Sequence, residues 1–138
     1  MFTTISKSFG VLAPLRPLAG WFIRLSFASV FLYHGTDKFI SGIEGFGGAL
    51  EPIFGGASLL IAFLVAVAEI LAGIGAIVGG FRNDDFGDAV TRLAGLAAFP
   101  VMVGAFVIVR FGGPWVDMEK DVLLTGTAVY LMLKGKDV

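Results

Sequence analysis

Long apolar runs, separated by short polar segments, occupy most of this sequence. Four runs are expected to be helices, at residues 18–39, 57–80, 89–109 and 118–133. A run of about 20 apolar residues is long enough to cross the hydrocarbon core of a bilayer as a helix. A membrane barrel would instead need alternating segments of about ten residues, and this sequence lacks them. The pattern therefore predicts an all-α fold, an integral membrane four-helix bundle.

The segment before the first run has a different pattern. Its apolar residues recur at spacings of three and four: Phe2, Ile5, Phe9 and Leu12. This spacing favours a short amphipathic helix that lies along the membrane surface. Pro14 ends it, and Pro17 suits the first turn of the helix that follows. We therefore expect an N-terminal interfacial segment at residues 1–17 and a four-transmembrane-helix domain at residues 18–138.

The basic residues outside the spans or near their ends predict an orientation. The side that holds both termini and the middle loop carries Lys7, Arg16, Arg82, Lys134 and Lys136. The opposite side carries Lys38, Arg110 and Lys120. Because cytoplasmic segments hold the excess of lysine and arginine, we expect both termini in the cytoplasm.

The composition agrees with a membrane domain and excludes several kinds of redox centre and binding partner. The chain is 57% hydrophobic and 15% charged, with a net charge of −1 and no basic block, so nucleic acid is not an expected partner. It has no cysteine, which excludes disulfides and iron–sulfur clusters, and its one histidine excludes a bis-histidine haem within the chain. We expect no metal site and no cofactor held by this chain's own ligands.

Charged residues inside the apolar runs are the most informative polar positions. Arg24 lies in the first run, and Glu69 lies near the middle of the second. A charge at bilayer depth costs about 2.5–3.5 kcal/mol even on insertion scales, so it normally faces the bundle interior and has a partner. We therefore expect Arg24 and Glu69 to form a structural ion pair.

Further polar residues extend this set along the bundle. His34 lies on the same helical face as Arg24, Lys38 lies one turn beyond it, and Glu119 opens the last run. One interpretation is a quinone-binding or proton-handling site formed by His34, Lys38, Glu69 and Glu119, because histidine titrates near neutral pH. The other is a structural network that only holds helices together. No residue is assigned a catalytic role, and the pattern leaves both interpretations open.

The chain resembles the DoxX family in an ordered set of short motifs. These are Arg24, His34-Gly35-x-x-Lys38, Glu69 with Gly73, and Glu119. The resemblance covers nearly the whole chain from Leu18 and implies a four-helix protein of the prokaryotic cytoplasmic membrane. Thr36 and Asp37 inside the second motif, and the extended N-terminal segment, depart from the family pattern.

The resemblance also implies a function. Founding members of the family are small subunits associated with quinol oxidase or thiosulfate:quinone oxidoreductase activity. We expect an accessory membrane subunit of a respiratory or quinone-linked oxidoreductase complex, with a quinone bound in or beside the chain. Its partners would be the lipid bilayer and other membrane subunits or further copies of itself. The alternative is a structural or assembly subunit without its own chemistry. A transporter is less favoured, because the four spans contain no inverted repeat.

Overall fold

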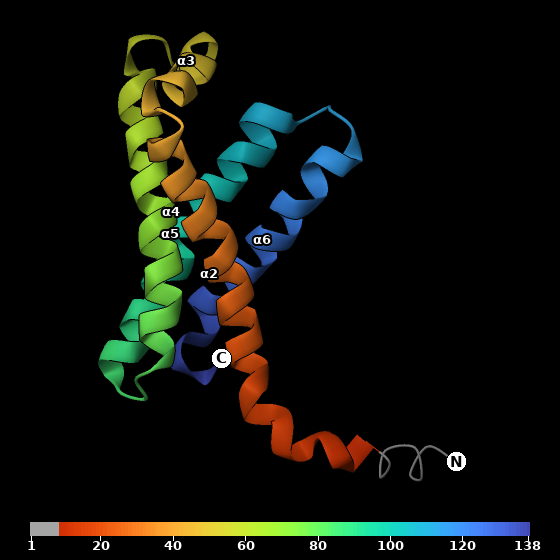
Figure 1. The fold of residues 1–138 in the computed structure, drawn as a ribbon. Helices are drawn as coiled ribbons and strands as arrows, with labels where there is room; N and C mark the ends of the chain where they lie inside the picture. Colours follow the sequence, from red (N-terminus) through yellow and green to blue (C-terminus); the bar gives the residue numbers. More distant parts are fainter. Residues whose placement is uncertain (1–8) are drawn as a thin grey trace.

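The structure, a computed structural model, describes residues 9–138, and every regular element in that range is helical. The four long helices are α2 (Arg16–Ile40), α4 (Ser58–Gly80), α5 (Asp85–Gly104) and α6 (Trp115–Lys134). The shorter α-helix is α3 (Ile43–Phe54), and three 3-10 segments are η1 (Phe9–Leu15), η2 (Gly55–Ala57) and η4 (Gly135–Asp137). A π-helix, η3 (Ala105–Arg110), continues α5 directly. The predicted all-α helical bundle is confirmed (Figure 1).

The expected helix boundaries shift at the N-terminal side. Residues 1–8 of the predicted interfacial segment lie outside the described residues. The part that is described forms the 3-10 helix η1, and α2 begins at Arg16, with Pro17 in its first turn. Proline is well suited to that position because the first turn of a helix leaves its N–H groups without intrahelical partners.

Three stretches of the described chain are long and apolar enough to cross a membrane: Gly10–Ile40, Ile43–Gly80 and Asp85–Arg110. Helix α6 has 20 residues but concentrates charge in its first two turns, at Asp117, Glu119, Lys120 and Asp121. Large apolar side chains still face outward from α6, such as Leu123, as they do from the other long helices. This outward apolar surface is what a bundle embedded in lipid requires, and the chain is an integral membrane protein.

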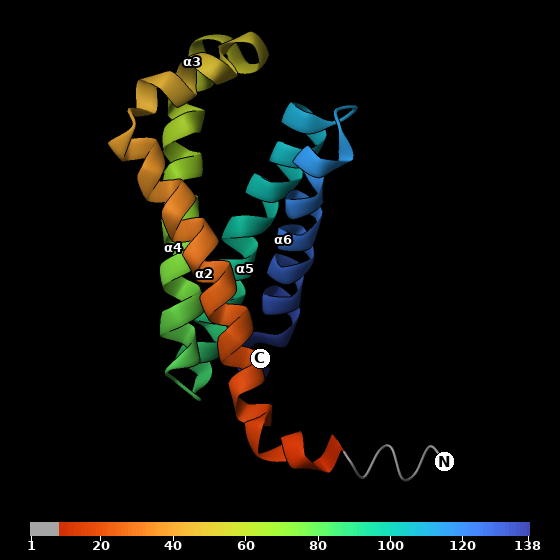
Figure 2. The same cartoon turned by 45° about the vertical axis from the view of Figure 1, so that its right-hand side comes forward.

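The long helices form two pairs, α2 with α4 and α5 with α6. Figures 1 and 2 show the pairs close together where the C-terminus and the α4–α5 turn lie, and further apart where α3 lies. We call these two ends of the bundle the C-terminal end and the α3 end. Helix α3 lies across the tip of α4 (Figure 2), and the glycine at position 42 (φ of 100°) makes the sharp turn that leads into it.

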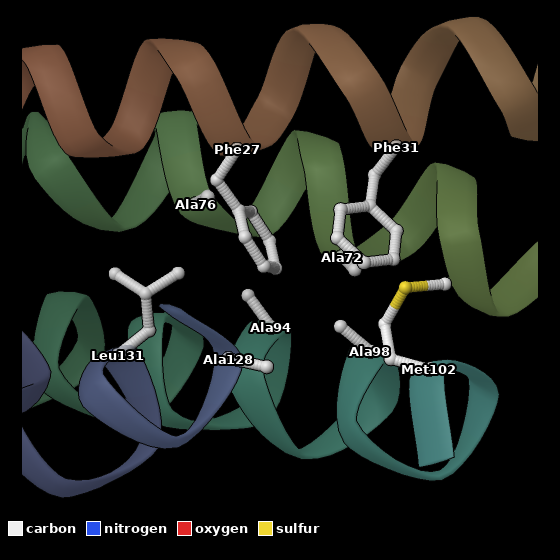
Figure 3. Close-up of a cluster of buried hydrophobic side chains, with 9 residues drawn as sticks. All are labelled: Phe27, Phe31, Ala72, Ala76, Ala94, Ala98, Met102, Ala128 and Leu131. Atoms are coloured by element: carbon white, nitrogen blue, oxygen red, sulfur yellow. The ribbon is translucent and has the colours of Figure 1, made fainter. Parts of the chain in front are cut away.

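The core fills the half of the bundle where the two pairs are close. Phe27 and Phe31 project from α2, with ring centroids 4.4 Å apart, towards the other three helices (Figure 3). The facing positions are mostly alanines, together with one methionine and one leucine: Ala72, Ala76, Ala94, Ala98, Ala128, Met102 and Leu131. Small residues let helix backbones approach closely in lipid, and the two phenylalanine rings fill the space that remains.

Candidate functional site

A cavity of about 330 Å³ lies between the two helix pairs at the α3 end. Phe31 and Met102, which also belong to the core, lie against it on the side of the core. Leu50 and Phe54 of α3 line it at the opposite end, and most of its remaining surface is aliphatic. The cavity therefore begins where the close packing of the core ends.

Six ionisable side chains line this otherwise apolar cavity. They are His34 and Lys38 of α2, Glu69 of α4, Arg110 of η3, and Lys120 and Asp121 of α6. The structure thus brings together three of the four residues expected at a polar site, and Glu119 is not among them. Whether the cavity binds a quinone stays a prediction at this point.

Lys38 and Glu69 form an ion pair across the α2–α4 interface. Lys38 Nζ lies 2.6 Å from Glu69 Oε2, and it also donates to the backbone oxygen of His34 at 3.3 Å. The aromatic ring of Phe46 covers the ammonium, with its centroid 4.9 Å from Nζ. The Glu69 side chain is 5% exposed and the Lys38 side chain is 15% exposed. The charge of Glu69 is therefore compensated by a partner that is also largely buried.

A glycine makes this pairing possible. Gly35 packs against α4, where a Cβ at this position would lie 3.0 Å from the backbone oxygen of Ala66 and 2.8 Å from the Ile70 side chain. Any larger residue would push the two helices apart. The short interhelical distance at Gly35 lets Lys38, less than one turn later, reach Glu69 on the facing helix.

The prediction that Arg24 forms an ion pair with Glu69 is wrong. Arg24 is 2% exposed, and its guanidinium donates to the backbone oxygen of Ala76 (3.0 Å), to Thr91 Oγ1 (2.9 Å) and to the backbone oxygen of Gly135 (3.2 Å). Ala76 lies seven residues after Glu69, which is about 10 Å along the helix. In the antiparallel register of α2 and α4, Arg24 therefore lies at the C-terminal end and Lys38 takes its expected place beside Glu69.

Glu119 is exposed, and Asp121 occupies the buried position that was expected for it. Asp121 is 1% exposed and forms an ion pair with Arg110 at the end of η3. The helical spacing of the sequence indicates this placement. Asp121 falls at spacings of three, seven and ten from Leu124, Ala128 and Leu131, which are cavity or core residues, whereas Glu119 lies off that face.

His34 also lines the cavity, one helical turn before Lys38. Its imidazole is partly buried and contacts the ring of Tyr33 edge-on, with centroids 5.5 Å apart. Within residues 9–138, no hydrogen bond joins this imidazole to another protein group. The same range contains no group of three or more His, Asp or Glu side chains arranged to hold a metal ion.

A known protein family matches this sequence. The DoxX family model matches residues 20–110, from the first turns of α2 to the last residue of η3. The chain belongs to the DoxX family. No curated protein and no solved structure matches it. Arg24, His34, Lys38 and Glu69 lie inside the part that matches DoxX, whereas Glu119 and Asp121 lie beyond it.

Proposed function

We propose that this DoxX protein is an accessory membrane subunit of a quinone-linked oxidoreductase complex, and that its cavity holds the quinone headgroup. The observation that carries the proposal is that oppositely charged side chains form ion pairs in the wall of an otherwise apolar cavity. Two ion pairs, Lys38–Glu69 and Arg110–Asp121, come from opposite helix pairs and line one cavity. Small-molecule sites combine an apolar lining with a few polar groups and begin at about 300 Å³.

The chemistry of a quinone headgroup fits these groups. Its carbonyl oxygens accept hydrogen bonds, and Lys38 on one wall and Arg110 on the other are donors. His34 adds an imidazole that can donate or accept a hydrogen bond. The ring of the ligand would lie against Phe31 and Met102, and its isoprenoid tail would extend into the lipid.

In this proposal the chain holds the ligand and its protons, and it does not transfer the electrons itself. A quinone supplies the two-electron chemistry, and partner subunits would hold the redox centre that exchanges electrons with it. Glu69 and Asp121 are the two buried carboxylates at the cavity, so they are the groups that can compensate a change of charge on a bound headgroup.

A direct binding measurement tests the site. The purified chain in lipid nanodiscs would be titrated with a short-chain quinone, and crosslinking by an azidoquinone would locate the contact. Ala105→Phe places a ring in the cavity wall, whereas Val107→Phe, two residues later, changes a residue that does not line the cavity. We expect Ala105→Phe to weaken binding at least tenfold and Val107→Phe to leave it unchanged. Equal binding by both variants, or no saturable binding, would exclude the site.

A second measurement tests the assignment to a complex. The chain would be purified from its native membranes in mild detergent, and the co-purifying proteins and quinone-dependent turnover would be recorded. Glu69→Gln and His34→Ala are expected to lower turnover while the complex stays assembled. An assembled complex with unchanged turnover in both variants would instead support the structural or assembly subunit.

A further inference from the structure

Next to the cavity, the surface of the protein has a hollow at the α3 end. It is formed by the α5–α6 turn and lined by Arg110, Gly112, Gly113, Asp117 and Lys120 among others. Its exposed surface is mainly polar, whereas the cavity beneath is mainly apolar. Val109, Arg110 and Lys120 line both spaces, so the hollow and the cavity adjoin each other at these side chains.

The ion pair at this junction differs from the one on the opposite wall. The Arg110 side chain is 32% exposed, and its partner Asp121 is 2% exposed. The pair therefore has one member in contact with the surface hollow and one facing the interior. The Lys38–Glu69 pair is less exposed at 15% and 5%, and the ring of Phe46 covers its ammonium. Of the two charged walls, the Arg110–Asp121 wall is the more exposed, and it is the one that adjoins the polar hollow.

We propose that the hollow and the cavity form one aqueous route from the membrane surface at the α3 end, and that the Arg110–Asp121 ion pair closes it. When the pair is formed, the guanidinium fills the junction. When Arg110 swings into the hollow, where water can solvate it, the junction opens to water and protons. This route goes beyond the proposed function, because it is a property of the chain's own side chains and does not depend on which molecule occupies the cavity.

The closing role follows from the energetics of a buried carboxylate. Removal of Arg110 from Asp121 would leave an unpaired charge at the cavity unless water enters with the movement, since an isolated buried ion is strongly unfavourable. Opening and hydration are therefore coupled. The π-helix η3, which ends at Arg110, is a form of helix that often occurs as a local irregularity at functional sites.

The absence of cysteine from the sequence allows a clean accessibility test. Val101→Cys places a thiol on the cavity wall, and Val103→Cys places one on the same helix outside the lining. Each would be introduced into the otherwise native chain, in lipid nanodiscs, and modified with membrane-impermeant methanethiosulfonates. A cationic and an anionic reagent would be used in parallel. The modification rate of each thiol would then be measured with and without a change at the ion pair.

We expect Asp121→Asn to raise the modification rate at Val101→Cys at least tenfold with both reagents, and to leave the rate at Val103→Cys unchanged. A rise with one reagent and a fall with the other would mean that only the local potential had changed, and this would overturn the proposal. Equal rates in the native and Asp121→Asn backgrounds would also overturn it.

Two further variants keep the test interpretable. Glu119→Gln removes an exposed acid of the same helix and is expected to leave both rates as they are in the native chain. Arg110→Gln combined with Asp121→Asn removes both charges and leaves no unpaired ion, so it guards against a loss of fold in the single variant. The double variant should be as reactive as Asp121→Asn, and a rate equal to the native one would overturn the closing role. None of these outcomes depends on quinone, so the route can fail while the proposed function stands.

Discussion

Lys38 of α2 and Glu69 of α4 are joined by an ion pair of 2.6 Å within the apolar part of the bundle. The pair lies one helical turn from His34 on the wall of the cavity. It replaces the pairing of Glu69 with Arg24 that the sequence alone suggested. The two alternatives make different thermodynamic predictions, because residues in contact couple in free energy and distant residues do not.

Loss of Lys38 should be more harmful than loss of the whole pair. Lys38→Met leaves the Glu69 carboxylate buried without its cation, which is expected to cost roughly 3–5 kcal/mol. The Lys38→Met, Glu69→Gln double variant removes the unpaired charge and should recover much of that loss. The free energy of unfolding in mixed detergent–SDS micelles, followed by circular dichroism, measures both. A double variant less stable than Lys38→Met would contradict the ion pair.

Arg24 and Glu69 should act independently. Arg24→Met removes hydrogen bonds to two backbone oxygens and to Thr91, and at about 1.5–3 kcal/mol for each charged hydrogen bond it should be strongly destabilising. The effects of Arg24→Met and Glu69→Gln on the same unfolding free energy should add within about 0.5 kcal/mol. A coupling free energy of about 1 kcal/mol or more would instead support an ion pair between Arg24 and Glu69.

The close approach at Gly35 should tolerate no side chain. Gly35→Ala places a Cβ against the Ala66 backbone and the Ile70 side chain, and overpacking of this kind costs typically about 1–3 kcal/mol. Gly126→Ala is the matched control in α6, since nothing lies within 4 Å of the added Cβ. We expect the control to be neutral or slightly stabilising, as alanine is the better helix former. Equal thermal stability of the two variants would refute the contact.

The α4–α5 turn should lose stability only in strong acid. Hydrogen bonds from Arg82 and from the backbone N–H of Gly87 lower the pKa of Asp84 from 3.8 to about 2. Because the pKa is lower in the folded state, the stabilisation is present above pH 3.8 and is lost as the pH falls towards 2. Asp84→Asn keeps an N-cap side chain that does not titrate.

Thermal unfolding of the native chain and of Asp84→Asn between pH 5 and pH 2 checks this expectation. The native chain should be the more stable at pH 5, and the difference should shrink as the pH falls through the range between the two pKa values of Asp84. Parallel curves over the whole range would show that the Asp84 carboxylate contributes nothing to the fold.

The periodicity of the sequence predicted the helices well, but a charged helix was the hardest to place. The last run was expected at residues 118–133, and α6 extends further at its N-terminus, to Trp115. Glu119 opens that run and matches a family motif, and both features favour it as a site residue. The helical spacing of Asp121 from Leu124 and Leu131 instead favours Asp121 as the residue that faces the interior. Arg110 follows the expected run at residues 89–109, so the pattern of apolar runs does not indicate that it pairs with a buried carboxylate.

The sequence by itself determined that the chain is a bundle of membrane helices, because apolar runs of this length have few other stable arrangements. It also determined which few ionisable residues would have to find partners within the bundle, among them Arg24, Lys38 and Glu69. Only the tertiary structure decided the partners. A helix repeats its faces every turn, so several cations can face Glu69, and the interhelical register fixed by contacts such as Gly35 against Ala66 selects Lys38.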